Sequence, residues 1–190
     1  YRGMDRAALD AAYDNTAAVG NARRDQYMAG WVARSEALRK ARPARLNLPY
    51  GGGARQRVDM FACGTPGAPT LVYIHGGYWQ MNDKEPYAFV GEGPLAAGFK
   101  LGLDAAEAAR NSPMRHLRSE AGPLVVTVGL GERHELIRQS EEYAAAWKQR
   151  GLRGRYLPVP KHDHFSILEE LAQPQGTILR ALKEMAFSRG

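Results

Sequence analysis

The chain has 190 residues, of which 44% are hydrophobic and 24% charged, a composition that is ordinary for a folded domain and excludes a disordered chain. No run approaches the roughly 18 consecutive apolar residues that would span a bilayer, and the first residues lack the apolar core of a signal peptide. The single cysteine, Cys63, excludes an internal disulfide and a multi-cysteine metal site. We therefore expect one cytoplasmic domain over residues 1–190, with a helical segment 1–43, a core 44–190 and no membrane partner.

The net charge of +6 raises the question of nucleic-acid binding. The basic residues gather at positions 23–45 and 148–161, where they alternate with alanine and acidic residues on helical patterns. No recognisable nucleic-acid motif accompanies them, so we interpret them as solvated helix faces and expect no nucleic-acid partner.

The first half of the chain predicts helices followed by strands. Helical patterns cover residues 5–14 and 24–41, and Pro43 ends the second. Residues 57–61 alternate like a half-buried strand. Residues 70–74 form a continuous β-branched and aromatic run, which predicts a strand buried on both faces, as in a parallel sheet.

The remaining elements continue this alternation. We expect helices over residues 84–98 and 104–110 and from 136 up to Gly151, strands over 124–128 and 155–159, and a last helix with Pro174 at its first position. Such alternation predicts an α/β protein with a mainly parallel sheet. In these sheets, ligands bind beyond the carboxyl ends of the strands, so the loops at those ends are the places to look for a site.

The loop after the strand at 70–74 is His75-Gly76-Gly77. Two glycines allow a sharp turn and bring backbone N–H groups close to a substrate oxygen, as an oxyanion hole requires. A plain tight turn is the alternative. The next residues, Tyr78 and Trp79, could form the wall of an aromatic or acyl pocket.

The other two strand-end loops carry Glu132 and His164. His164 could be the general base for an acyl-transfer nucleophile; it could also be an ordinary surface histidine, or bind a metal together with His162. The metal interpretation is weaker because no third ligand is evident. Glu132 could orient the histidine, in the order acid before histidine that α/β-hydrolases show. Alternatively it is an acid at a helix N-terminus, and Glu135 is a second candidate.

Residues 40–185 resemble the arylformamidase (kynurenine formamidase) family and its esterase relatives, and the resemblance rests on residues 68–74, His75-Gly76-Gly77-Tyr78-Trp79, Glu132 with residues 138–140, and His164-Phe165. These relatives are α/β-hydrolases, with helices on both faces of the sheet. The resemblance implies hydrolysis of N-formyl-kynurenine, a step of tryptophan catabolism, or of a related aryl formamide or ester, by a Ser–acid–His triad.

The resemblance also implies roles for individual residues. Glu132 matches the acid, which is usually Asp in the family, and His164 matches the base. The oxyanion hole corresponds to Gly76, Gly77 and Tyr78, and the substrate-binding residues to His75, Tyr78 and Trp79. The implied partner is a small-molecule substrate; no metal and no organic cofactor is implied, and a homodimer is left open.

The Gly-x-Ser-x-Gly nucleophile elbow of that family is absent. No serine of the chain has glycines two residues to either side; the serines are Ser35, Ser112, Ser119, Ser140, Ser166 and Ser188. Between about Phe99 and Leu101 the chain also lacks two central strands with their helices, a segment of at least about 50 residues. A sheet without them would expose apolar surface and unpaired backbone groups. We therefore expect these 190 residues to be inactive as a serine hydrolase. A non-catalytic homologue that acts as a binding or interaction protein is the alternative.

Overall fold

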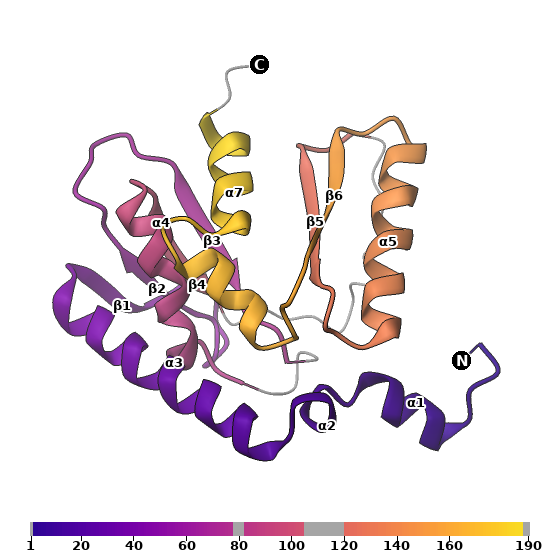
Figure 1. The fold of residues 1–190 in the computed structure, drawn as a ribbon. Helices are drawn as coiled ribbons and strands as arrows, with labels where there is room; N and C mark the ends of the chain where they lie inside the picture. Colours follow the sequence, from indigo (N-terminus) through magenta and orange to yellow (C-terminus); the bar gives the residue numbers. More distant parts are fainter. Residues whose placement is uncertain (1, 78–81, 105–119, 188–190) are drawn as a thin grey trace. The chain divides into compact units, whose positions relative to one another are not determined.

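The computed structural model describes residues 2–77, 82–104 and 120–187 (Figure 1). The chain divides into two compact units, one made of residues 1–27 and 111–167 and the other of residues 28–110 and 168–190. The expectation of a single domain over residues 1–190 remains a prediction. Both units combine helices with strands, so the predicted α/β class is confirmed. No helix within the described ranges is both long and apolar enough to cross a membrane.

The first unit is built on a pair of parallel strands. Its elements are α1 (Arg6–Tyr13), α2 (Asn15–Val19), the beginning of α3 (Asn21–Ala41), β5 (Leu124–Gly129), α5 (His134–Gln149), β6 (Gly154–Val159) and the short turn η3 (Ser166–Leu168). Strand β5 pairs with β6 from Leu124 opposite Gly154 to Gly129 opposite Val159. Helix α5 packs on both strands, and its Trp147 donates from Nε1 to the Arg153 carbonyl at 2.9 Å.

The second unit contains a four-stranded sheet. Its elements are α3 from Met28 on, β1 (Ala44–Pro49), β2 (Arg57–Phe61), β3 (Thr70–Ile74), the tight helical turns η1 (Glu85–Gly91), α4 (Glu92–Ala96), β4 (Lys100–Asp104), α6 (Glu169–Ala172) and α7 (Thr177–Phe187). The strand order is β1-β2-β4-β3. Strands β3 and β4 are parallel, whereas β2 is antiparallel to both of its neighbours.

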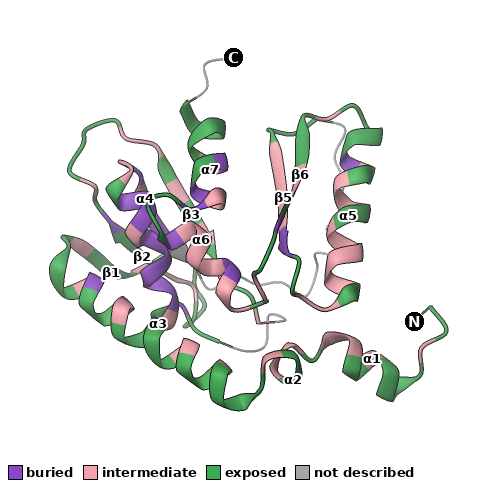
Figure 2. Ribbon diagram, in the orientation of Figure 1, coloured by how far each residue is buried: buried purple, intermediate pink, exposed green. Residues whose placement is uncertain are grey.

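Figure 2 shows where the buried residues of the second unit lie along its ribbon. Aromatic side chains from α3 and η1 form much of this core. The rings of Trp31 and Phe89 stack with their centroids 5.2 Å apart, and Tyr87 lies 5.8 Å from Trp31. Trp31 and Leu38, which lie seven residues apart on α3 and so share one face of the helix, are both buried. Burial of such side chains contributes about 1.5–3 kcal/mol each, so η1 is held mainly through its apolar face.

The prediction that residues 70–74 are buried on both faces was wrong. Strand β3 alternates instead, and Val72 and Ile74 are 58% and 55% exposed. A strand is buried on both faces only where other elements cover both, and the face of β3 that carries Thr70, Val72 and Ile74 is exposed. Among the described strands β3 also pairs with β4 alone, so one of its edges is free. Its exposed apolar face is the kind of surface that a sheet without its central strands was expected to leave.

Residues near the expected join at Phe99–Leu101 form the strand β4, which pairs on both sides with β2 and β3. Phe99 is buried immediately before it, and the Lys100 N–H donates to the Pro69 carbonyl at 2.9 Å. The backbone therefore runs on into the sheet at this point. The short helix expected over residues 104–110 lies outside the described residues, apart from Asp104, which ends β4.

The last helix begins later than predicted. Pro174 lies in the turn between α6 and α7, and α7 starts at Thr177. The Glu170 carboxylate accepts a hydrogen bond from the Thr177 N–H at 2.5 Å, which supplies the cap that sets the helix start. The predicted helix at 84–98 is realised as η1 and α4, over Glu85–Gly91 and Glu92–Ala96.

An exposed apolar edge strand promotes association between chains. We therefore expect the chain to self-associate with rising concentration, and Val72→Lys to reduce this association because a charge on β3 opposes edge pairing. Light scattering after size-exclusion chromatography measures the effect. Thr70→Glu is a control for added charge at the beginning of the strand and should act less. Equal association of Val72→Lys and the unsubstituted chain would contradict the prediction.

Candidate functional site

The parallel pairing of β5 and β6 brings the loops that follow them to one edge of the two-stranded sheet. The Leu130 N–H donates to the Val159 carbonyl at 2.9 Å, and the Gly131 N–H donates to the His162 carbonyl at 2.8 Å. A Cβ atom on Gly129 would lie 2.3 Å from the His162 oxygen. Only glycine fits there, so the close approach of the two loops explains the glycine-rich sequence after β5.

Glu132 and His164 meet across these two loops. The His164 Nδ1 atom lies 2.8 Å from Glu132 Oε2, which confirms the contact expected from the sequence. The other carboxylate oxygen, Oε1, accepts from the Gly129 N–H at 3.1 Å. Since a carboxylate accepts, Nδ1 carries the proton and Nε2 is left as the basic nitrogen of the neutral ring.

The two side chains differ sharply in burial. The Glu132 side chain is 7% exposed, whereas that of His164 is 48% exposed. A carboxylate in so enclosed a place needs hydrogen bonds to compensate for its lost hydration, and the Gly129 N–H and the His164 ring supply them. The arrangement can hold an imidazole in one orientation and stabilise its protonated form, while Nε2 remains on the exposed side chain.

Glu135, the second candidate acid, and Asp163, which directly precedes His164, both have other partners. Asp163 Oδ1 accepts from the backbone N–H groups of Phe165 at 3.0 Å and Ser166 at 2.8 Å. Burial by itself would raise the pKa of Asp163, but these bonds and the nearby Arg23 outweigh it, so the pKa is lowered. Glu135 is hydrogen-bonded to Arg138, which lowers the pKa of Glu135 to about 2. Neither acid is hydrogen-bonded to His164 among the described contacts.

His162 has a different role from His164. Its Nδ1 atom lies 3.1 Å from the Ser166 carbonyl oxygen, and its own carbonyl holds the Gly131 N–H. Across residues 2–77, 82–104 and 120–187, no group of three or more His, Cys, Asp or Glu side chains is arranged to hold a metal ion. His162 therefore supports the backbone of the two loops.

The beginning of α3 packs on the histidine loop, a contact for which the sequence carries no local signal. Phe165 stacks on Tyr27 with ring centroids 5.9 Å apart and planes at 5°. His164 meets Phe165 edge-on at 5.8 Å, and Arg23 forms an ion pair with Asp163 at 3.2 Å. Arg23 thus constrains Asp163, which precedes the candidate base, and Tyr27 constrains Phe165, which follows it.

The glycine turn belongs to the second unit and is held there by an aromatic stack. The His75 ring lies 5.4 Å from that of Tyr87, with planes at 7°, and its Nδ1 atom lies 2.7 Å from the Gly76 oxygen. The buried His75 Nε2 atom has no hydrogen-bond partner in the structure as described. Gly77 has a φ of 126°, which disfavours a side chain. A Cβ on Gly76 would meet open space.

Of the remaining predicted site residues, Tyr78 and Trp79 lie outside the described residues, as do Ser112, Ser119 and Ser188. The other three serines all bond to backbone. Ser35 donates to the Pro86 carbonyl, Ser140 donates to the Leu136 carbonyl, and Ser166 accepts from the Asp163 N–H. None of these three has the flanking glycines of a nucleophile elbow.

Kynurenine formamidases are among the known sequences to which the chain is similar. The one from Salmo salar is 40% identical over 47 residues, which are 24% of this chain and 16% of the relative. The one from Danio rerio is 20% identical over 248 residues, covering 80% of this chain and 85% of the relative. Since 248 exceeds the 190 residues present here, that relative has segments without a counterpart in this chain. No family model matches the chain.

Two solved structures share the fold. A provisionally named thioesterase from Silicibacter sp. TM1040 has a TM-score of 0.75 at 21% identity and covers 94% of this chain and 98% of its own. Esterase B from Lactobacillus rhamnosis has a TM-score of 0.57 at 11% identity and covers 90% and 95%. At these identities the likeness establishes the fold, which is that of the α/β-hydrolases. Together with the sequence relatives it supports a hydrolase of the esterase or formamidase type.

The carboxylate contact predicts the tautomer of His164. In ¹⁵N spectra of the neutral ring we expect the proton on Nδ1, because Glu132 can only accept there. Glu132→Ala should remove that preference while leaving the His162 ring unchanged, since its Nδ1 faces the Ser166 carbonyl instead. A neutral His164 with its proton on Nε2 in the unsubstituted chain would show that the contact is not formed in solution.

The pair of Glu135 with Arg138 predicts a pH dependence of stability. The pKa of Glu135 is lowered from 4.5 to about 2, so its contribution is fully present above pH 4.5 and is lost as the pH falls toward 2. Glu135→Gln should therefore flatten the loss of stability between these pH values. Denaturant titrations across this range measure it, with Glu36→Gln on α3 as a control.

Proposed function

We propose that the chain carries the acid–base half of a serine hydrolase of the arylformamidase or carboxylesterase type. Its substrate would be N-formyl-kynurenine or a related aryl formamide or ester, in the cytoplasm. The observation that carries the proposal is the 2.8 Å contact between Glu132 and His164 across two strand-end loops. Kynurenine formamidases as sequence relatives and esterases as fold neighbours support the same class.

In the proposed mechanism, His164 Nε2 takes the proton of a serine hydroxyl as that oxygen attacks the substrate carbonyl. The protonated ring is then stabilised by Glu132, which also keeps it in the orientation that the transfer requires. His164 later returns the proton to the leaving amine or alcohol, and water repeats the sequence to release the acid. The N–H groups of the turn at Gly76, Gly77 and Tyr78 would hold the negative oxygen. The mechanism invokes no metal and no organic cofactor.

The serine of this triad is not among these 190 residues, so the chain by itself should form no acyl-enzyme. The missing elbow also favours a second candidate function, a non-catalytic homologue that binds a small molecule or a partner. The acid–base pair argues against it, because a purely binding protein has no need of an orienting carboxylate behind a half-exposed histidine. Aromatic side chains at Tyr78 and Trp79 would suit an aryl group in either case.

A chimera distinguishes the two functions. We would insert the elbow segment of the Danio rerio relative after β4, which ends at Asp104, and assay aryl formamide and aryl ester hydrolysis. The chimera should gain turnover, His164→Ala should lower it by about 10²–10⁴-fold, and Glu132→Gln should lower it strongly. His162→Ala, the matched control, should change it much less.

The unmodified 190-residue chain should not react with a fluorophosphonate probe, which labels activated serines. Labelling would reveal a nucleophile within these residues and contradict the expected inactivity. A folded chimera that binds the substrate without turnover would favour the non-catalytic homologue. Turnover that is lost in His162→Ala and kept in His164→Ala would overturn the assignment of the base.

A further inference from the structure

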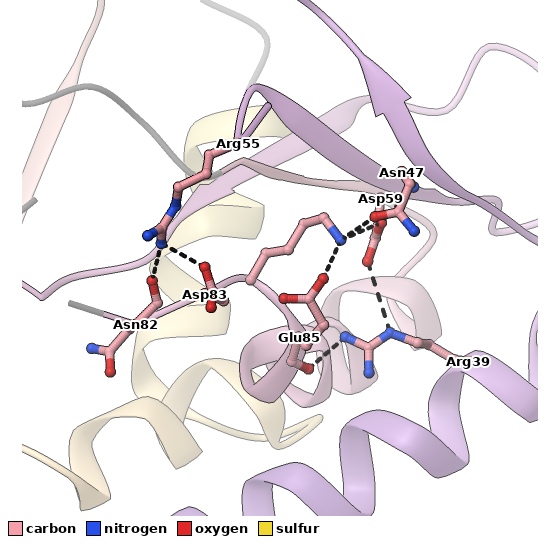
Figure 3. Close-up of polar contacts among 8 residues, drawn as sticks. Arg39, Asn47, Arg55, Asp59, Asn82, Asp83 and Glu85 are labelled. Carbon is pink, nitrogen blue, oxygen red and sulfur yellow. Dashed lines mark hydrogen bonds and ion pairs between the residues drawn. The ribbon is translucent and has the colours of Figure 1, made fainter. Parts of the chain in front are cut away.

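A buried lysine lies shortly after the glycine turn in the second unit. Lys84 directs its ammonium group at three acceptors: Asp59 Oδ1 at 2.9 Å, Asn47 Oδ1 at 2.8 Å and Glu85 Oε1 at 2.6 Å (Figure 3). The Lys84 and Asp59 side chains are only 6% and 1% exposed. An ammonium group has three donors, so every donor of this lysine has an acceptor.

The carboxylate of Asp59 has further partners besides Lys84. Its Oδ1 atom also accepts from the Asn47 N–H at 2.8 Å, and its Oδ2 atom lies 3.8 Å from Arg39 Nε. Arg39 in turn donates from Nη2 to the Glu85 carbonyl at 2.5 Å. The network therefore joins α3, β1, β2 and the start of η1. Buried ion pairs of this kind are costly to desolvate and are weak evidence for added stability, which raises the question of what this one positions.

Its place along the chain suggests the answer. Lys84 precedes η1 directly, and Tyr87, three residues later, carries the stack with His75. His75 thus stacks on η1, and Lys84, the residue directly before η1, is paired with Asp59. Asp59 lies on β2, so the ion pair holds η1 to the sheet in one register.

We propose that Lys84 is a positioning residue, which acts through its buried pair with Asp59 to hold η1 and thereby the turn at His75, Gly76 and Gly77. What the turn does rests on the proposed function, but its position can be measured without any activity. If the pair only added stability, an uncharged replacement that restores stability would also restore the turn. If the pair positions η1, such a replacement restores stability but leaves the turn less ordered.

The test uses the ¹⁵N-labelled full chain with Lys84→Met and with the double variant Lys84→Met/Asp59→Asn. The single variant leaves a buried carboxylate without its ammonium and should unfold at a clearly lower temperature. The double variant removes both charges and keeps an acceptor for the Asn47 N–H, so its unfolding temperature should recover in large part.

In the double variant the backbone order parameters of Gly76 and Gly77 should still fall, from about 0.85 toward 0.6 or below, and the nuclear Overhauser contacts between His75 and Tyr87 should weaken. Asp83→Asn is the matched control, because Asp83 pairs with Arg55 in the same segment but both side chains are exposed. It should change neither quantity. Order parameters at Gly76 and Gly77 that equal those of the unsubstituted chain would overturn the proposal.

A measurement on the unsubstituted chain keeps the proposal testable if the variants do not fold. The Lys84 ammonium protons should exchange with water slowly enough to give their own resonance, with Overhauser contacts to Asn47. An ammonium signal averaged with those of exposed lysines would show that the pair is not formed, and would overturn the proposal. Neither result depends on whether the chain hydrolyses any substrate.

Discussion

The parallel pairing of β5 with β6 is the constraint on which the candidate site depends. Because Gly129 stands opposite Val159, the loops that follow leave the same edge of the sheet. They can then touch only if no side chain intervenes, since a Cβ on Gly129 would lie 2.3 Å from the His162 oxygen. The hydrogen bond from the Gly131 N–H to the His162 carbonyl completes the contact, and Glu132 and His164 follow in the same two loops.

The site places an enclosed acid behind an accessible base. Glu132 is 7% exposed and has both oxygens occupied, whereas His164 is 48% exposed with one ring nitrogen occupied. This division follows from the chemistry of each group. A carboxylate that orients a ring gains from a low-dielectric setting in which its hydrogen bonds are strong, but an imidazole that is to exchange a proton must meet its partner. The surrounding acids are kept from the ring by bonds of their own.

The second unit contains a buried charge of the opposite sign, which is also fully hydrogen-bonded. The Lys84 side chain is buried and each of its three N–H donors has an acceptor, so directional hydrogen bonds fix its position in addition to apolar contacts. The glycine turn has its own restraint in the stack of His75 on Tyr87. In both units a buried charge with complete hydrogen bonding holds a short loop that ends a strand, whereas the apolar core holds the helices and strands from which the loops emerge.

The sequence by itself determined the α/β class, the strands at 57–61 and 70–74, and the placement of Glu132 and His164 in loops at strand ends, because periodicity and strand-end position are local patterns. Only the tertiary structure decided among the acids: Asp163 and Glu135 are as close in sequence, but backbone N–H groups occupy the first and Arg138 the second. It also decided that one face of β3 is exposed and that, among the described strands, β3 pairs with β4 alone, because both depend on tertiary neighbours. The packing of Tyr27 on Phe165 joins residues far apart in the chain, and no local pattern encodes such a contact.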